Sequence, residues 1–187
     1  MNKHEYYLAV KTLASPIFEV NSWDNIILYP WAVYPDRSLE LYQTFKPEGE
    51  YAINDYASLP EHSFSKRVIE EAGLRHIYGI NFVSAHVEHK GETHEFYILN
   101  FLNEIECLDK INSKYNWNKK LQEIRSIRKL VLDMEKLKQI PLNKRLIFLL
   151  EEGSIALFHK SIVEQIMKTN PKGVKFITPD EFEYGMK

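Results

Sequence analysis

Residues 64–83, FSKRVIEEAGLRHIYGINFV, align without a gap with residues 158–177, FHKSIVEQIMKTNPKGVKFI. Five positions are identical in the two stretches, and four more exchange one β-branched residue for another. Each stretch begins with apolar residues at helical spacing and ends with a short apolar run typical of a strand. The repeat predicts two related helix–strand units around one sheet, although any helix followed by a strand can converge on this pattern.

Local signals mark the ends of the two predicted helices. Ser65 is suited to cap the first helix and Gly73 to end it, while Asn170-Pro171 ends the second. The predicted core-facing stripes are Phe64, Val68, Ile69 and Ala72 in the first helix, and Phe158, Ile162, Val163, Ile166 and Met167 in the second.

Other segments have the β-branched and aromatic content of strands. Strands are expected over residues 6–11, 25–29, 124–133 and 145–150, and a short helix over residues 134–139. This pattern predicts an α+β protein that has a mixed or antiparallel sheet and two or three helices. The 187 residues suit one domain (1–187), in which an aromatic, acidic and loop-rich N-terminal part (1–60) precedes a helix–strand core (61–187).

The stretch HVEHKGETHEFY, residues 86–97, has three histidines and three glutamates in its first ten positions. Such a density is common at metal sites and acid/base centres. The stretch lies in a predicted hairpin, in which residues 80–89 pair with residues 94–103 across a turn at Lys90-Gly91.

The pairing of this hairpin separates its histidines. A two-residue turn places His86 opposite Glu95 and leaves His89 and His94 together on the other face. A four-residue loop would shift the register but would keep the same residues on each face. Because a metal ion needs three or four converging ligands, two histidines on one face are too few. The hairpin tip is therefore expected to be solvated, without a metal site and without catalytic residues.

Composition gives few other signals of chemistry. The chain has one cysteine, Cys107, only seven glycines and no glycine-rich phosphate loop, and it has no run of roughly 20 apolar residues. Cys107 stands in an apolar run and is expected to be a buried structural thiol. We expect a cytoplasmic protein without disulfides, cofactors or a membrane partner, and no motif indicates an enzyme.

Charge is distributed unevenly along the chain. Residues 1–117 contain 10 basic and 17 acidic side chains, whereas residues 118–145 contain 9 basic and 3 acidic ones. The basic segment lacks interleaved aromatic residues, and lysines on an edge strand also discourage aggregation. Nucleic-acid binding is therefore not expected, although an RNA-associated regulator that uses this segment is an alternative.

Residues 23–56 combine eight aromatic side chains with six acidic and two basic ones. Tyrosine and tryptophan are enriched at protein interfaces, and an acidic surface suits a basic protein partner. The other interpretation is that most of these rings cover the core. The candidate partner-binding residues are Trp23, Trp31, Tyr34, Asp36, Glu48 and Glu50.

Four stretches together resemble the immunity proteins of bacterial polymorphic-toxin systems. They read HSFSKRVIEEAG, HEFYILNFLNEIECLDKINSKY, IRKLVLDMEKL and LFHKSIVEQIMKTNPKGVKFITP, and they lie between residues 50 and 180. The chain looks most like the immunity-protein-eleven family, and the sister immunity-protein-forty-three family is an alternative. The run Cys107-Leu108-Asp109, followed by Ser113, contributes to this resemblance.

The resemblance implies a cytoplasmic antidote to a toxin. Its partner would be the cognate toxin effector domain encoded nearby, which such proteins neutralise by occluding or distorting the active site. Members of these families have no enzymatic activity of their own, so the resemblance implies no cofactor. The alternative function is a small metal- or His/Glu-dependent enzyme that uses the hairpin at residues 86–95.

Overall fold

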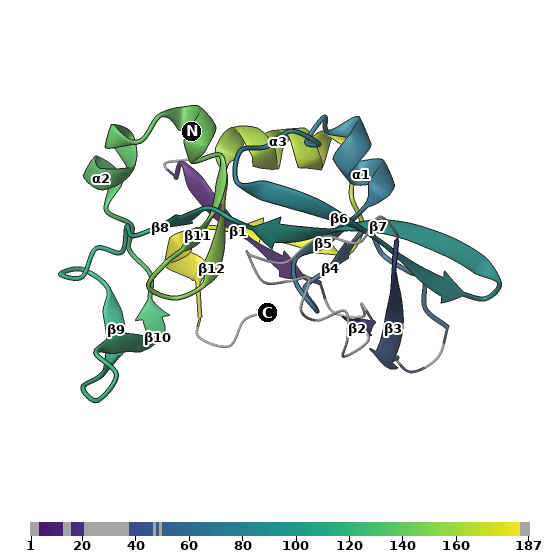
Figure 1. The fold of residues 1–187 in the computed structure, drawn as a ribbon, viewed down its shortest axis with the longest axis horizontal. Coiled ribbons are helices and arrows are strands. Elements are labelled where there is room, and N and C mark those ends of the chain that lie inside the picture. The colour runs from purple at the N-terminus through teal and green to yellow at the C-terminus, as the bar shows by residue number, and fades with distance from the viewer. Residues whose placement is uncertain (1–3, 13–15, 21–37, 47, 49, 184–187) are drawn as a thin grey trace.

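The computed structural model describes residues 4–12, 16–20, 38–46, 48 and 50–183 (Figure 1). The strands of this part are β1 (Tyr6–Lys11), β2 (Ile17–Val20), β3 (Leu39–Phe45), β4 (Tyr56–Ala57), β5 (Ser63–Ser65), β6 (Ile80–His89), β7 (Glu92–Phe101), β8 (Glu104–Ile105), β9 (Lys114–Asn118), β10 (Glu123–Lys129), β11 (Ile147–Leu150), β12 (Ile155–His159) and β13 (Val174–Ile177). Its α-helices are α1 (Lys66–Glu71), α2 (Met134–Gln139) and α3 (Lys160–Lys168), and short 3₁₀ turns cover Leu142–Lys144 and Pro179–Glu181.

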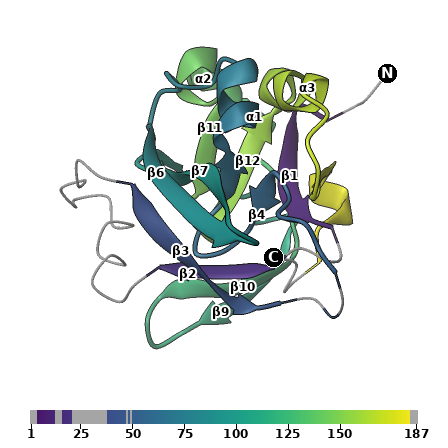
Figure 2. The same cartoon turned by 90° about the vertical axis from the view of Figure 1, so that its right-hand side faces the viewer.

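Two larger sheets and a separate hairpin make up the described fold. The first sheet has the strand order β13-β1-β12-β11-β8, the second has the order β2-β3-β6-β7-β5-β4, and β9 pairs with β10 alone. The β11–β8 and β3–β6 pairs are parallel, while the other pairs in both sheets are antiparallel. The predicted α+β class, with a mixed sheet and few helices, is confirmed. The three helices lie along one side of the molecule in both views (Figures 1 and 2).

Both halves of the sequence repeat form the same strand–helix–strand unit. In the first unit β5 leads into α1 and then β6, and in the second β12 leads into α3 and then β13. The Ser65 side chain accepts a hydrogen bond from the N–H of Val68, and the His159 side chain accepts one from the N–H of Ser161. The same position of the repeat thus caps both helices, although only serine is a preferred capping residue.

The helices are shorter than their sequence pattern predicted. Phe64 and Phe158, which the spacing placed in the helical stripes, belong to β5 and β12, because the backbone before a helix cap is extended. Met167 was expected in the core but is 47% exposed. The buried stripe of α3 is centred on Ile162 and Ile166, and Met167 lies at its margin.

The remaining predicted elements agree with the structure to different degrees. The strand over residues 6–11 and the helix over residues 134–139 coincide with β1 and α2. The strand predicted over residues 124–133 ends earlier, as β10, because Leu132 leaves the hairpin and forms an isolated bridge with Leu108. Residues 25–29 lie outside the described part of the chain.

The first sheet is buried on both faces. Along β1, Leu8 and Val10 join a cluster with α2 and β10, whereas Ala9 joins a cluster with α1 and α3. This two-sided burial explains why the sequence of β1 is an almost continuous apolar run. A third cluster packs on one face of the β2-β3-β6-β7 row. The described part of residues 1–60 therefore supplies strands to both larger sheets.

The β6–β7 hairpin has the predicted register, with His86 opposite Glu95. Lys90 and Gly91 form its turn with φ values of 52° and 81°. Positive φ at both central residues matches the right-handed twist of the strands, which is why a glycine suits this place. Because the loop has only two residues, β7 begins at Glu92 rather than at the predicted His94.

Candidate functional site

The histidines of the β6–β7 hairpin do not converge on one point. The rings of His89 and His94 have their centroids 6.3 Å apart, whereas His86 lies on the other face of the hairpin. His86 Nδ1 is 3.0 Å from Ser38 Oγ, and His89 Nε2 is 3.2 Å from the backbone oxygen of Tyr51. Within the described ranges, no group of three or more His, Cys, Asp or Glu side chains is placed to hold a metal ion.

The solvent side of the β2-β3-β6-β7 row is polar and rich in glutamate. Its members are Glu19, Glu40, Tyr42, His86, Glu88 and Glu95, which we call the acidic face. The strand registers place them on one side, because paired residues of neighbouring strands point the same way. The alternate positions, among them Leu39, Ala85 and Phe96, are buried in the third cluster. The four strands thus form a layer that is apolar inside and acidic outside.

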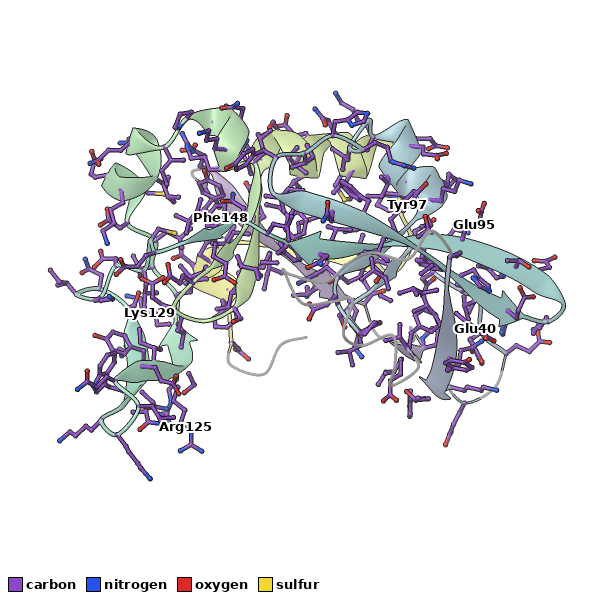
Figure 3. The ribbon with its side chains drawn as sticks, viewed as in Figure 1. Glu40, Glu95, Tyr97, Arg125, Lys129 and Phe148 are labelled. Atoms are coloured by element: carbon purple, nitrogen blue, oxygen red, sulfur yellow. The ribbon has the colours of Figure 1, made fainter. Side chains whose placement is uncertain are left out.

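The acidic face has little compensating positive charge. Lys66 Nζ of α1 is 2.9 Å and 3.0 Å from the two carboxylate oxygens of Glu95, and this hydrogen bond and charge raise the pKa of Lys66. Glu19, Glu40 and Glu88 form no ion pair with any residue in the described ranges. The face therefore carries a surplus of negative charge. Figure 3 places Glu40 and Glu95 at the end of the molecule formed by β3, β6 and β7.

Hydrogen bonds order part of the acidic face. The Tyr42 hydroxyl donates to Glu40 over 2.8 Å, and the Thr93 hydroxyl donates to Glu88. Tyr42 itself is 44% exposed and provides a ring edge beside the carboxylates. Tyrosine is among the residues enriched at protein interfaces, whereas the glutamates contribute charge to this surface.

Four of the six predicted partner-binding residues lie outside the described part of the chain, namely Trp23, Trp31, Tyr34 and Asp36. Glu48 and Glu50 are exposed, and the Glu50 side chain is 96% exposed with a carboxylate oxygen 3.7 Å from Lys90 Nζ. Glu50 therefore lies beside the turn of the β6–β7 hairpin, next to the acidic face.

The acidic face itself was missed in the sequence. Its signal is the alternation of buried and exposed residues in IFEV and LELY, which form β2 and β3. Each segment contributes only one glutamate, so the surface exists only after the strands pair.

A second polar cluster ties the start of β1 to β12. Arg145 Nη1 is 2.5 Å from Glu5 Oε1 and also donates to the Tyr6 hydroxyl. His159 Nε2 is 3.4 Å from the same Glu5 oxygen, and His159 Nδ1 is 2.8 Å from Ser161 Oγ. The side chains of Ser161, His159 and Glu5 thus form a chain of contacts like that of a hydrolytic triad.

This cluster is better suited to stabilise the fold than to catalyse a reaction. Burial lowers the pKa of His159; Glu5 opposes this shift and Arg145 adds to it. Burial would raise the pKa of Glu5, but the hydrogen bond and charge of Arg145 outweigh it and lower that pKa. Arg145 and His159 are 9% and 5% exposed, so a substrate would have little access to them.

The run that carries the family resemblance anchors the base of the β9–β10 hairpin. Asp109 N–H donates to the Val131 carbonyl over 2.9 Å, and Asp133 N–H donates to the Cys107 carbonyl over 2.8 Å. Ser113 Oγ donates to the Val131 carbonyl over 3.1 Å and accepts from its N–H over 3.0 Å. These residues therefore hold the two ends of the hairpin together and attach them to the core.

Cys107 is fully buried at this place. Burial, with a further contribution from the nearby Glu152 carboxylate, raises the pKa of the Cys107 thiol to about 12. A thiol with such a pKa stays protonated near neutral pH and is a poor nucleophile. The expected burial of the Cys107 thiol is confirmed.

A cleft of about 1010 Å³ lies between β1, β10 and the β11–β12 turn. Two of its carboxylates, those of Glu106 and Glu152, have partners. Glu106 is 2.8 Å from Lys110 Nζ, whose hydrogen bond lowers the pKa of Glu106, and Glu152 accepts hydrogen bonds from two backbone N–H groups over 3.1 Å and 3.3 Å. The lowered pKa favours the ionised form of Glu106, which is therefore not suited to general acid catalysis.

No protein-family model and no curated protein matches the chain. None of the helices in the described ranges is long and apolar enough to cross a membrane.

Proposed function

We propose that the chain is an immunity protein that binds a cognate antibacterial toxin and neutralises it by covering the toxin's active site. The observation that carries this proposal is the acidic face, a four-stranded surface on which only one of four glutamates has a basic partner among the described residues. A rigid sheet that presents unpaired charge is suited to bind a surface of opposite charge without reordering.

The charge of the face indicates the kind of toxin. Toxins that act on nucleic acids or nucleotides need basic active-site clefts, because their substrates carry phosphates. An acidic inhibitor surface can occupy such a cleft in place of the phosphates. Long-range attraction between the two surfaces also speeds association, which matters for an antidote that must bind before the toxin acts.

The acidic face would form one part of a wider interface. Glu50 adjoins it beside the hairpin turn, and Tyr42 provides an exposed aromatic ring within it. The predicted contacts at Trp23, Trp31, Tyr34 and Asp36 belong to the same proposal as additional partner-binding residues. Aromatic residues near the centre of an interface commonly carry most of its binding energy.

The enzymatic alternative has less physical support. The hairpin histidines are divided between two faces, and in the Glu5–His159–Ser161 cluster His159 is buried and Glu5 is bound by Arg145. Neither arrangement places a base, a nucleophile and an open substrate site together.

Co-expression tests the proposed function. The effector domain encoded beside this chain is expressed in a bacterial host alone, with this chain, and with the Glu40→Lys/Glu88→Lys variant. We expect the wild-type chain to restore growth and to co-purify with the effector domain, and the variant to lose both while staying folded by circular dichroism.

The matched control is Glu104→Lys/Glu164→Lys, which makes the same change in net charge at exposed residues on β8 and α3. This control should rescue growth as the wild type does. Rescue by the wild-type chain without a complex would instead indicate an enzymatic antidote, and no rescue would reject the proposal.

A further inference from the structure

The β9–β10 hairpin carries a concentration of unpaired positive charge. Its basic residues are Lys114, Lys119, Lys120, Arg125, Arg128 and Lys129, and Glu123 is its one acidic residue. In the described parts of the chain, none of the six basic side chains forms an ion pair. We call this element the basic hairpin.

The register of the basic hairpin is unfavourable for an isolated element. Lys114 stands opposite Lys129, and like charges at opposite positions destabilise a strand pair. Trp117 stands opposite Ile124 and is 52% exposed, and Leu121 in the turn is 62% exposed. A ligand with negative charge and flat apolar rings would relieve both the repulsion and the exposure.

The exposed indole lies among the cations. A hollow of about 530 Å³ is lined by Trp117, by Lys119, Lys120 and Arg125, and by Asn116 and Asn118. Asn118 Oδ1 accepts hydrogen bonds from the backbone N–H groups of Lys120 and Leu121 over 3.1 Å and 3.3 Å. These bonds order the turn, so the cations are presented from a defined backbone.

We propose that the basic hairpin binds single-stranded nucleic acid, with a base stacked on Trp117 and the flanking phosphates bound by Lys119, Lys120 and Arg125. Aromatic stacking combined with a positively charged track is the general mode of binding to single strands. An acidic peptide would match the charges but would leave the exposed indole without a flat partner. The basic segment 118–145 has no aromatic residue of its own, but Trp117 directly precedes it.

The charge distribution of the whole molecule supports this location. Arg125 and Lys129 lie at the opposite end of the molecule from Glu40 and Glu95 (Figure 3). A polyanion is repelled from the acidic face and steered toward the basic hairpin. This inference is independent of the proposed antidote function, because the two surfaces share no residue.

Fluorescence anisotropy with labelled oligothymidine and oligouridine, each of about 12 nucleotides, tests the proposal at low salt with the full-length protein. We expect binding that weakens as salt increases. Trp117→Ala should weaken binding roughly 5- to 150-fold, the effect of losing one stacked base, and Trp117→Phe should retain most of it. Arg125→Glu should weaken binding and reduce the slope of log K against log salt by about 0.7 for each lost phosphate contact.

Two controls separate the basic hairpin from general charge effects. Lys168→Glu, at an exposed residue of α3, makes the same change in net charge and should leave binding unchanged. Glu40→Lys/Glu88→Lys should not weaken oligonucleotide binding, whereas it should strongly weaken binding to the toxin, so the two proposals can fail separately. Circular dichroism checks that each variant is folded.

The two oligonucleotides distinguish the sources of a single strand. Tighter binding of oligouridine would indicate RNA as the ligand, and equal binding would indicate that either strand is accepted. The proposal is rejected if neither oligonucleotide binds at low salt, if Trp117→Ala binds as the wild type does, or if polyglutamate competes as well as an unlabelled oligonucleotide.

Discussion

The rings of Phe64 and Phe158 meet edge to face, with their centroids 6.4 Å apart and their planes inclined by 73°. Both side chains are fully buried, and each lies two residues before the first residue of a helix, at the same position of the sequence repeat. The two strand–helix–strand units therefore share one core through equivalent residues.

This contact predicts coupled effects on stability. Phe64→Leu and Phe158→Leu should each lower the free energy of unfolding by about 1–3 kcal/mol, because each leaves a gap in a close-packed cluster. The double variant should lose less than the sum, by about 0.5–1.5 kcal/mol, since the aromatic contact can be lost only once. Urea denaturation of the four proteins measures this coupling. Strict additivity would show that the rings do not interact.

Gly91 and Gly173 both have positive φ but differ in the space around the position of a Cβ atom. A Cβ atom on Gly173, whose φ is 85°, would lie 2.5 Å from Asn54 Cβ, whereas one on Gly91, whose φ is 81°, would meet no atom within 4 Å. Gly91→Ala should therefore lower the free energy of unfolding by about 1–2 kcal/mol from backbone strain alone. Gly173→Ala should lower it further, because Asn54 must also move. Equal losses in urea denaturation would contradict the close approach.

The buried cluster at Arg145 predicts sensitivity to acid. Because the pKa of His159 is lowered in the folded protein, only the unfolded chain takes up this proton as the pH falls below about 6.5. Stability should therefore decrease from about pH 6.5 downward, and it should decrease again below about pH 4.5, where the lowered pKa of Glu5 adds a second loss.

His159→Asn tests the first of these losses. Asparagine keeps an acceptor for capping α3 but does not titrate. Urea midpoints measured near pH 8 and near pH 5.5 should differ less in the variant than in the wild-type protein. An equal pH dependence in both proteins would assign the acid sensitivity to other groups.

Cys107 should be unreactive in the folded protein. Its pKa of about 12 leaves almost no thiolate near neutral pH, and its side chain has no exposed surface. A chromogenic disulfide reagent should label it slowly in buffer and at once in denaturant, with one equivalent per chain. Fast labelling of the native protein would show that the base of the β9–β10 hairpin opens.

The sequence predicted those elements whose signals are local. The Lys90-Gly91 turn determined the register of β6 and β7, and Ser65 marked the start of α1. The strand β12 was missed, because its last apolar residues resemble the start of the following helix. Phe158 consequently was placed in α3 rather than in the sheet.

The candidate surfaces were harder to predict, because their residues come from separate segments. Glu19, Glu40 and Glu95 become neighbours only through strand pairing, and the parallel β3–β6 pair has no short turn that would indicate it. Trp117 directly precedes the basic segment 118–145, so the composition of that segment includes no aromatic residue. Pairing in β9–β10 places it among them.

The most direct test of the proposed function is a titration of the purified effector domain, with its own toxic activity as the readout. We predict that the wild-type chain abolishes this activity near a one-to-one molar ratio and that Glu40→Lys/Glu88→Lys requires a large excess, while Glu104→Lys/Glu164→Lys inhibits as the wild type does. Full activity of the effector domain at a saturating excess of the wild-type chain would contradict the antidote function. Equal inhibition by the acidic-face variant would remove the acidic face from the interface.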